Sequence, residues 1–184
     1  MITKTLATAI LNIAGWKASA EYPFQYPKLI IISAPHTSMW DFIWGRLYFM
    51  SIGLPVTLLI KAKYFFWPLG PILRFFGAIP VHLGKDTSFV KSIVNELNAK
   101  ERINLIVTPE GTRKATKRWR LGFYFISKEA KIPIMLGYLD YKKKLVGVGP
   151  IIIPGESQQE DMANITKFYK AEWAKHPSKF IELG

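Results

Sequence analysis

The sequence has no cysteine among its 184 residues. Without thiols the chain can form no disulfide, no thiolate metal site and no cysteine nucleophile, although the redox compartment stays undecided. It also lacks the G-x-S-x-G turn that carries the serine nucleophile of many hydrolases. Two common kinds of covalent nucleophile are therefore excluded.

Acidic residues are scarce as well, since 13 Asp and Glu face 25 Lys and Arg and leave a formal net charge of +12. Such an excess indicates anionic partners, namely anionic lipid, nucleic acid or a polyphosphate ligand. Hydrophobic residues make up 49% of the chain and aromatic residues 14%. This composition excludes a disordered chain and is rich in the rings that settle among lipid headgroups.

No segment is apolar for long enough to span a bilayer, which takes about 20 mostly apolar residues. The best candidate, residues 42–60, is interrupted by Arg46, Gly53 and Pro55. The sequence therefore predicts no transmembrane helix.

The N-terminal segment, residues 1–20, has three interpretations. Lys4, an apolar run and Ala18-Ser19-Ala20 resemble a secretory signal peptide, although Asn12 and Lys17 interrupt that pattern. Apolar residues also form one helical stripe with lysines at its ends, made of Ile2, Leu6, Ile10 and Ile13. We expect an amphipathic helix on an anionic membrane surface, with the protein peripheral on the cytoplasmic face. A packing helix and a signal peptide remain the alternatives.

Short apolar runs alternate with helical patterns along the rest of the chain, residues 21–184, which predicts a single α/β domain. We expect a mixed, mostly parallel sheet flanked by helices. The predicted strands are 29–33, 56–61, 78–83, 105–108, 133–139 and, as an edge strand, 145–153. The predicted helices are 39–51, 87–100, 121–130 and one that begins at Ser157. Residues 65–76 are rich in aromatics, Pro and Gly, so we expect at most a short helix there.

The first candidate site follows the strand at 29–33. His36 lies just beyond the carboxyl end of that strand, where open α/β sheets place their sites. Asp41 lies in the first turn of the next helix, so a hydrogen bond between the two side chains is feasible. That bond would fix the histidine tautomer and leave the other ring nitrogen free to accept a proton. The alternative is structural, with Asp41 in a capping box begun by Ser38 and His36 bonded to backbone.

The second candidate site is the turn Glu110-Gly-Thr-Arg113, which follows the strand at 105–108. Gly111 permits close backbone approach, Thr112 offers a hydroxyl, and Arg113 offers a forked cation suited to phosphate. Glu110 could bond backbone amides or orient Arg113. The alternative is an exposed turn with an incidental ion pair.

Five of the eight residues from 113 to 120 are basic. Such a run is typical of a solvated face, and it could also bind acidic headgroups or a nucleotide phosphate. Because Trp119 stands among these cations, a nucleic-acid-binding module is an alternative function. A basic run without a recognised binding fold supports it weakly, and we expect no nucleic-acid partner.

Together the two candidate sites resemble the motifs of the glycerolipid acyltransferase family, which includes the 1-acylglycerol-3-phosphate acyltransferases. That family carries an H-x-x-x-x-D block and, about 70 residues later, an E-G-T-R block. Here these blocks are His36 to Asp41 and Glu110 to Arg113. The surroundings are similar to the family's second and fourth blocks at 61–63, 66–70, 77–81 and 130–134. The resemblance runs from about Leu29 to Gly155.

The resemblance implies a glycerol-3-phosphate acyltransferase-like fold and an O-acyltransferase of phospholipid biosynthesis. It implies that His36 takes the proton of a lysophospholipid hydroxyl as this attacks the thioester of acyl-CoA or acyl carrier protein, while Asp41 orients His36. The first expectation for the acceptor is 1-acylglycerol-3-phosphate. The implied phosphate-binding residues are Glu110, Gly111, Thr112, Arg113 and His82. No cofactor and no metal are implied, and the three histidines (His36, His82, His176) are too scattered for a metal site.

Three positions depart from the family pattern. The second block usually ends in an arginine that contacts phosphate, whereas His82 lacks that permanent charge and fork. Met135-Leu136 replaces a repeated proline, and Lys114 stands where a small hydroxyl residue is common. The acceptor is thus less determined than the reaction. Another lysolipid, an amino-lipid acceptor and an inactive membrane scaffold remain the alternatives.

Overall fold

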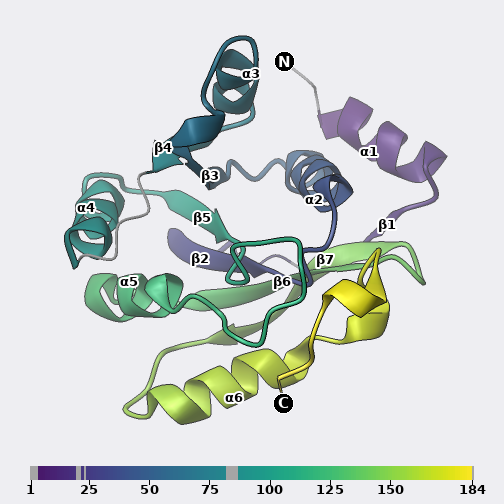
Figure 1. The fold of residues 1–184 in the computed structure, drawn as a ribbon. Coiled ribbons are helices and arrows are strands. Elements are labelled where there is room, and N and C mark those ends of the chain that lie inside the picture. The colour runs from purple at the N-terminus through teal and green to yellow at the C-terminus, as the bar shows by residue number, and fades with distance from the viewer. Residues whose placement is uncertain (1–3, 20–21, 23, 82–86, 184) are drawn as a thin grey trace.

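The structure is a computed structural model that describes residues 4–19, 22, 24–81 and 87–183. A seven-stranded sheet in the order β1-β7-β6-β2-β5-β3-β4 forms the centre, with helices above and below it (Figure 1). All neighbouring strands run parallel except β6 and β7, which are antiparallel. This confirms the predicted single α/β domain with a mixed, mostly parallel sheet.

Six of the seven strands lie close to their predicted positions, and β1 was not predicted. The strands are β1 (Lys17–Ala18), β2 (Lys28–Ser33), β3 (Thr57–Lys61), β4 (Ala78–Val81), β5 (Ile103–Val107), β6 (Ile134–Asp140) and β7 (Leu145–Ile152). The prediction of an edge strand at 145–153 is wrong in one respect, because β1 pairs with β7 and takes the edge position. The backbone amides of Lys17 and Ser19 donate to the carbonyls of Lys144 and Val146, respectively, each at a distance of 2.8 Å.

The helices include one short element that the sequence left open. They are α1 (Lys4–Ile13), α2 (Met39–Ser51), η1 (Ala62–Tyr64), α3 (Leu69–Phe75), α4 (Thr87–Asn98), α5 (Gly122–Ala130), α6 (Gln158–Phe168), η2 (Ala171–Trp173) and η3 (Pro177–Lys179). Helix α3 occupies the segment expected to be irregular with at most a short helix. No helix among the described residues is long and apolar enough to cross a membrane.

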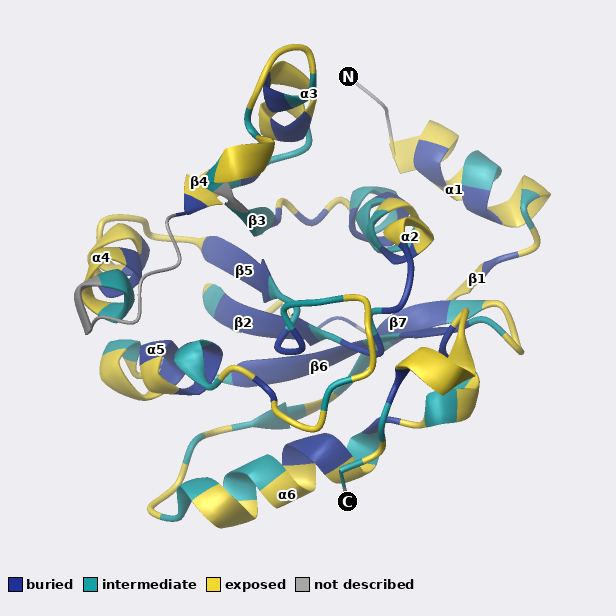
Figure 2. Ribbon diagram, viewed as in Figure 1, coloured by how far each residue is buried: buried dark blue, intermediate teal, exposed yellow. Residues whose placement is uncertain are grey.

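The side chains of β2 alternate between two hydrophobic cores, as the period of two in a strand requires. Ile30 and Ile32 pack on one face of the sheet, against α4, α5 and α6. Leu29 and Ile31 pack on the other face, against α1 and α2. All four side chains are fully buried, so β2 is the centre of both cores (Figure 2).

Helix α1 packs on α2 and contributes Ala7 and Leu11 to the second core. Of the predicted apolar stripe, Ile13 is 88% exposed and Ile10 is half-buried, while Ile2 lies outside the described residues. The short helix therefore has one face that packs and one apolar face that meets solvent. Phe42 of α2 in turn contacts Phe76, just after α3, edge to face at 6.1 Å between ring centroids.

Candidate active site

His36 and Asp41 lie in contact, as their spacing predicts. His36 follows the end of β2, and Asp41 lies in the first turn of α2, so the loop between them brings the side chains together. The Nδ1 atom of His36 lies 3.2 Å from Oδ2 of Asp41, with the imidazole about one-fifth exposed and the carboxylate buried. This contact assigns the Nδ1–H donor to the carboxylate and leaves Nε2 as the basic nitrogen.

Asp41 also performs the structural role that the sequence offered as the alternative. Its Oδ2 accepts hydrogen bonds from the backbone amides of Thr37 and Ser38, both at 2.8 Å, which completes a capping box with Ser38. Burial alone would raise the pKa of Asp41, but hydrogen bonds from His36, Tyr141 and Ser38 outweigh burial and lower the pKa below its ordinary value. The carboxylate therefore stays ionised next to His36.

Tyr141 also belongs to the candidate site, although it lies outside both sequence motifs. It follows β6, and its hydroxyl donates to Oδ1 of Asp41 at 2.7 Å. Burial, together with this bond to a carboxylate, raises the pKa of Tyr141, so the phenol stays a donor. The two residues are 100 positions apart. No local pattern in the sequence could have paired them.

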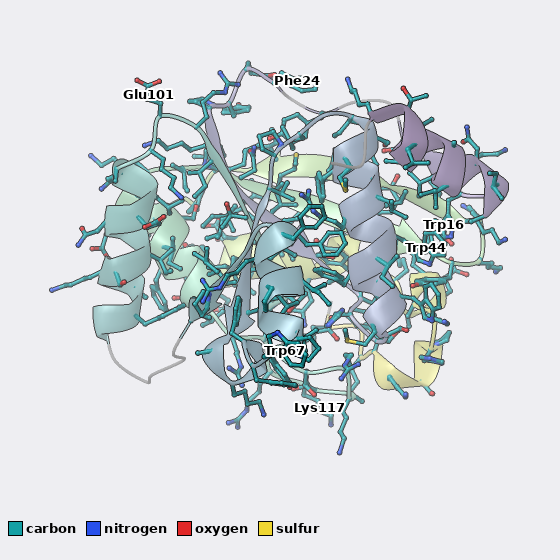
Figure 3. The ribbon with its side chains drawn as sticks, turned by 90° about the horizontal axis from the view of Figure 1, so that it is seen from above. Trp16, Phe24, Trp44, Trp67, Glu101 and Lys117 are labelled. Atoms are coloured by element: carbon teal, nitrogen blue, oxygen red, sulfur yellow. The ribbon has the colours of Figure 1, made fainter. Side chains whose placement is uncertain are left out.

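Aromatic rings hold Tyr141 in place. Trp16 meets the Tyr141 ring edge to face at 5.0 Å and the Trp44 ring at 5.4 Å, and Figure 3 shows Trp16 and Trp44 together between α1 and α2. Trp44 stacks in turn on Trp40 at 5.7 Å. This row of packed rings connects the N-terminal segment to Tyr141, which holds Asp41.

Glu110 joins the two motifs. Its Oε1 atom accepts a 2.7 Å hydrogen bond from the backbone amide of His36, and the residue is only 4% exposed. Burial raises the pKa of Glu110 to about 7, the bond from His36 opposes that rise, and the charge of Asp41 adds to it. Of the two roles that the sequence offered Glu110, the structure shows the bond to a backbone amide, which ties the E-G-T-R turn to the histidine loop.

The rest of the E-G-T-R turn faces outward. Gly111 has a φ of +60°, which favours glycine, and its α-carbon lies against the side chain of Arg120, whose Nε atom would be 2.5 Å from an added Cβ. The Arg120 backbone amide donates to the carbonyl of Pro109 at 2.8 Å and closes the basic loop onto the turn. Thr112 Oγ1 accepts from the amide of Lys114 at 3.2 Å, and Arg113 is exposed.

The remaining histidines have different positions. His82 lies outside the described residues. His176 touches the site through its backbone, since its amide donates to Oγ1 of Thr37 at 3.3 Å. In the part of the chain that the structure describes, no three His, Asp or Glu side chains gather as a metal site.

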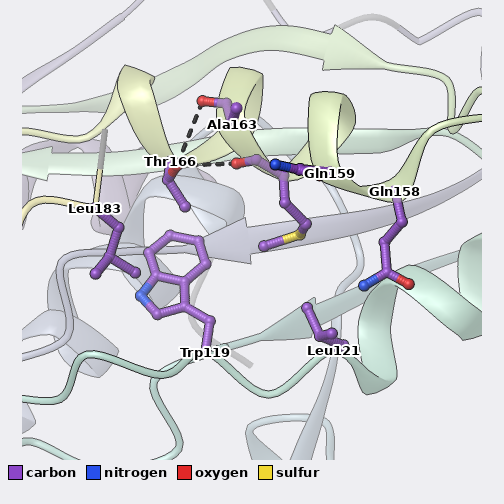
Figure 4. A pocket seen from close by; sticks show the side chains of 8 residues that line it. Trp119, Leu121, Gln158, Gln159, Ala163, Thr166 and Leu183 are labelled. Atoms are coloured by element: carbon purple, nitrogen blue, oxygen red, sulfur yellow. Dashed lines mark hydrogen bonds between the residues drawn. The ribbon is translucent and has the colours of Figure 1, made fainter.

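A shallow groove of about 570 Å³ lies between α6 and the segment around Trp119, and neither His36 nor Asp41 lines it (Figure 4). Its lining is mostly apolar, and it contains none of the predicted site residues. The lining residues are Trp119, Leu121, Gln158, Gln159, Met162, Ala163, Thr166 and Leu183. The groove therefore adds no group to the chemistry of His36.

The chain is similar to known proteins in its fold and in its sequence family. Among solved structures, the chain is similar to the 1-acyl-sn-glycerophosphate (LPA) acyltransferase PlsC from Thermotoga maritima, with a TM-score of 0.62 and 12% identity over 90% of this chain and 74% of that chain. At this identity the likeness shows the fold alone. A search of curated protein sequences finds no match. A family model described as Acyltransferase matches residues 20–135, well over half of the chain and both motifs, so the chain belongs to the acyltransferase family that this model describes.

Proposed function

We propose that the protein transfers a fatty acyl group from acyl-CoA or acyl carrier protein to a hydroxyl of a lysophospholipid, with 1-acylglycerol-3-phosphate as the preferred acceptor. The observation that carries this proposal is the 3.2 Å contact between His36 Nδ1 and Asp41 Oδ2. This contact leaves Nε2 free to act as the base. The backbone amide of the same histidine donates to Glu110, which belongs to the turn that contains Arg113.

In the proposed reaction, Nε2 of His36 takes the proton of the acceptor hydroxyl while its oxygen attacks the thioester carbonyl. A carbon–oxygen bond forms and the tetrahedral intermediate then breaks its carbon–sulfur bond. The departing thiolate receives the proton from His36, so the histidine ends as it began. Asp41 stabilises the imidazolium between these steps, and Tyr141 holds Asp41 in position.

The acceptor phosphate is assigned to the outward side of the E-G-T-R turn. Arg113 offers a planar fork of donors, the geometry that suits phosphate best. Glu110 is turned inward to His36, so its role is to set the distance between this turn and the base. The cations of residues 113–120 add a positive field that attracts an anionic substrate.

The acceptor is a membrane lipid, so we also propose that the protein is peripheral on the cytoplasmic face of an anionic membrane. The support is the apolar outer face of α1, where Ile13 is 88% exposed, together with the net charge of +12.

The test is mass spectrometry of products formed from acyl-CoA or acyl carrier protein donors and a panel of lysolipids. We expect Arg113→Ala to raise KM for 1-acylglycerol-3-phosphate by at least about tenfold, because a charge-assisted bond is lost, and to affect an acceptor without a phosphomonoester less. Arg118→Ala, in the same basic run, is the matched control. Equal effects of Arg113→Ala on both acceptors would contradict the phosphate assignment.

The acylation of a different lysolipid or an amino-lipid is the second candidate, favoured by histidine at position 82 where the family pattern has arginine. If the acceptor is a phosphomonoester, His82→Arg preserves or improves its use. A clear loss of activity in that variant would favour the second candidate.

A further inference from the structure

The segment around α3 exposes more apolar surface than a helix facing water needs. Helix α3 buries Gly70 and Leu73, while its outer side and the turn before it stand free (Figure 2). We call residues 63–75 the α3 knob. Its exposed large hydrophobic side chains are Tyr64 at 41%, Phe66 at 58%, Trp67 at 84%, Ile72 at 49% and Phe75 at 63%. Contiguous apolar patches of this kind mark binding surfaces.

Cations are interleaved with these rings. The ammonium of Lys63 lies 5.0 Å from the ring centre of Tyr64, and the guanidinium of Arg74 lies 5.2 Å from that of Phe65. The sequence places no Asp or Glu between Asp41 and Asp86, so no carboxylate of the knob balances these charges. Aromatic rings mixed with Lys and Arg are the composition of a bilayer interface, and the positive charge matches anionic headgroups.

Figure 3, which looks down on the α1, α2 and α3 side, places Trp67 and Lys117 of the basic loop toward the same end. On α2, the exposed Met39 and Trp40 follow His36 by only three and four residues. The loop that carries His36 is thus followed by exposed apolar side chains of its own.

We infer that the α3 knob is a membrane-contact surface that inserts Trp67 and Phe75 into the interface of an anionic phospholipid bilayer. The contact is separate from the one expected of α1. The inference deepens the proposed function and rests on it for the lipid acceptor, because an enzyme held on the bilayer meets an acceptor that stays in the bilayer.

The test is flotation of the full chain with phosphatidylcholine vesicles, with and without phosphatidylglycerol. Trp67→Ser combined with Phe75→Ser is expected to lower partitioning onto the anionic vesicles by at least about tenfold, because two large apolar side chains lose their burial in lipid. Phe125→Ser combined with Ile153→Ser is the matched control, since these side chains are 46% and 72% exposed outside α1, α2 and the knob. The control pair should stay within about twofold of wild type.

Two further arms separate the possible outcomes. Lys63→Gln combined with Arg74→Gln should remove most of the preference for anionic vesicles, and the Trp67/Phe75 pair should keep its activity on detergent-dispersed acceptor. Wild-type partitioning by the Trp67/Phe75 pair would overturn the inference. So would knob-dependent self-association in sedimentation velocity without vesicle binding. A wild-type chain that binds vesicles through the knob but transfers no acyl group would contradict the proposed function and leave this inference standing.

Discussion

Helices α1, α2 and α3 lie on one side of the sheet and α4, α5 and α6 pack on the other, and the two layers differ in what they turn outward (Figure 1). The only acid within α1, α2 and α3 is Asp41, which is buried. Helices α4, α5 and α6 carry exposed acids beside exposed lysines, for example Glu96, which pairs with Lys100 at 2.6 Å. Ten of the thirteen exposed large hydrophobic side chains of the described residues come from 4–13, 39–51 and 62–75.

Both layers nevertheless bury the same kind of side chain against the sheet. The two cores are aliphatic and aromatic throughout, and β2 supplies fully buried isoleucines to each. Packing against the sheet therefore requires the same kind of side chain from both layers. The two layers differ in their outer surfaces. The pair of His36 and Asp41, to which we assign the catalysis, lies at the start of α2 in the acid-poor layer.

The largest expected effect compares two histidines, His36 before α2 and His176 after α6. His36→Ala should lower acyl transfer by about 100- to 10,000-fold, because it removes the proposed general base. His176→Ala should leave most activity, because the hydrogen bond between His176 and Thr37 is made by the histidine's backbone amide, which the substitution keeps. Thiol release from acyl-CoA in the presence of lysolipid measures both variants, with melting temperatures to confirm folding. Full activity of His36→Ala would overturn the mechanism.

The second effect concerns the buried Glu110, in contrast to the exposed acids of α4, α5 and α6. Because its pKa in the folded protein is raised to about 7, the folded state holds a proton that the unfolded state has released. This contribution to stability is complete below the ordinary pKa of a glutamate and is lost as the pH rises through about 7. Glu110→Gln should therefore gain, relative to wild type, at most roughly 3 kcal/mol of unfolding free energy by pH 8.

Melting curves between pH 4 and pH 8 measure this difference. At pH 4 the two proteins should melt alike, since both side chains are then neutral and both can accept the hydrogen bond from His36 N. A constant offset between the two curves at every pH would show that titration of Glu110 is not its cause.

The third effect concerns Tyr141, whose ring packs on Trp16 and whose hydroxyl donates a hydrogen bond to Asp41. Tyr141→Phe keeps the ring that packs on Trp16 but removes the donor to Asp41, so kcat should fall about tenfold with little change in KM. Tyr138→Phe is the control, since its ring packs on Phe168 and Trp173. A change in KM alone would contradict a positioning role.

The smallest effect sharpens the comparison of the two outer surfaces directly. Ile13→Ser on α1 should weaken binding to anionic vesicles about fivefold, since one exposed apolar side chain leaves the lipid. Ile153→Ser, just after β7, is the matched control, because its side chain is 72% exposed against 88% for Ile13. Vesicle flotation with both variants decides the question, and equal effects would show that the two surfaces do not differ in lipid binding.

Most of the fold could be predicted because it follows from local patterns. Helix α2 begins and ends where the sequence predicts, since Ser38 and Asp41 form a capping box within one turn. The contact between His36 and Asp41 was also predictable, because a strand end, a short loop and a helix start constrain residues five positions apart. The edge position of β1 was not, because a two-residue strand carries no periodicity of its own.

The sequence by itself indicated the reaction class, since it contains in order both motif blocks that resemble those of the acyltransferase family. Only the tertiary structure decided that Glu110 turns inward to His36, that Tyr141 completes the support of Asp41, and that Trp67 faces outward. The physical reason is range. A cap or a turn is formed by neighbours in the chain, whereas a hydrogen bond between residues 74 or 100 positions apart exists only once the strands have taken their order in the sheet.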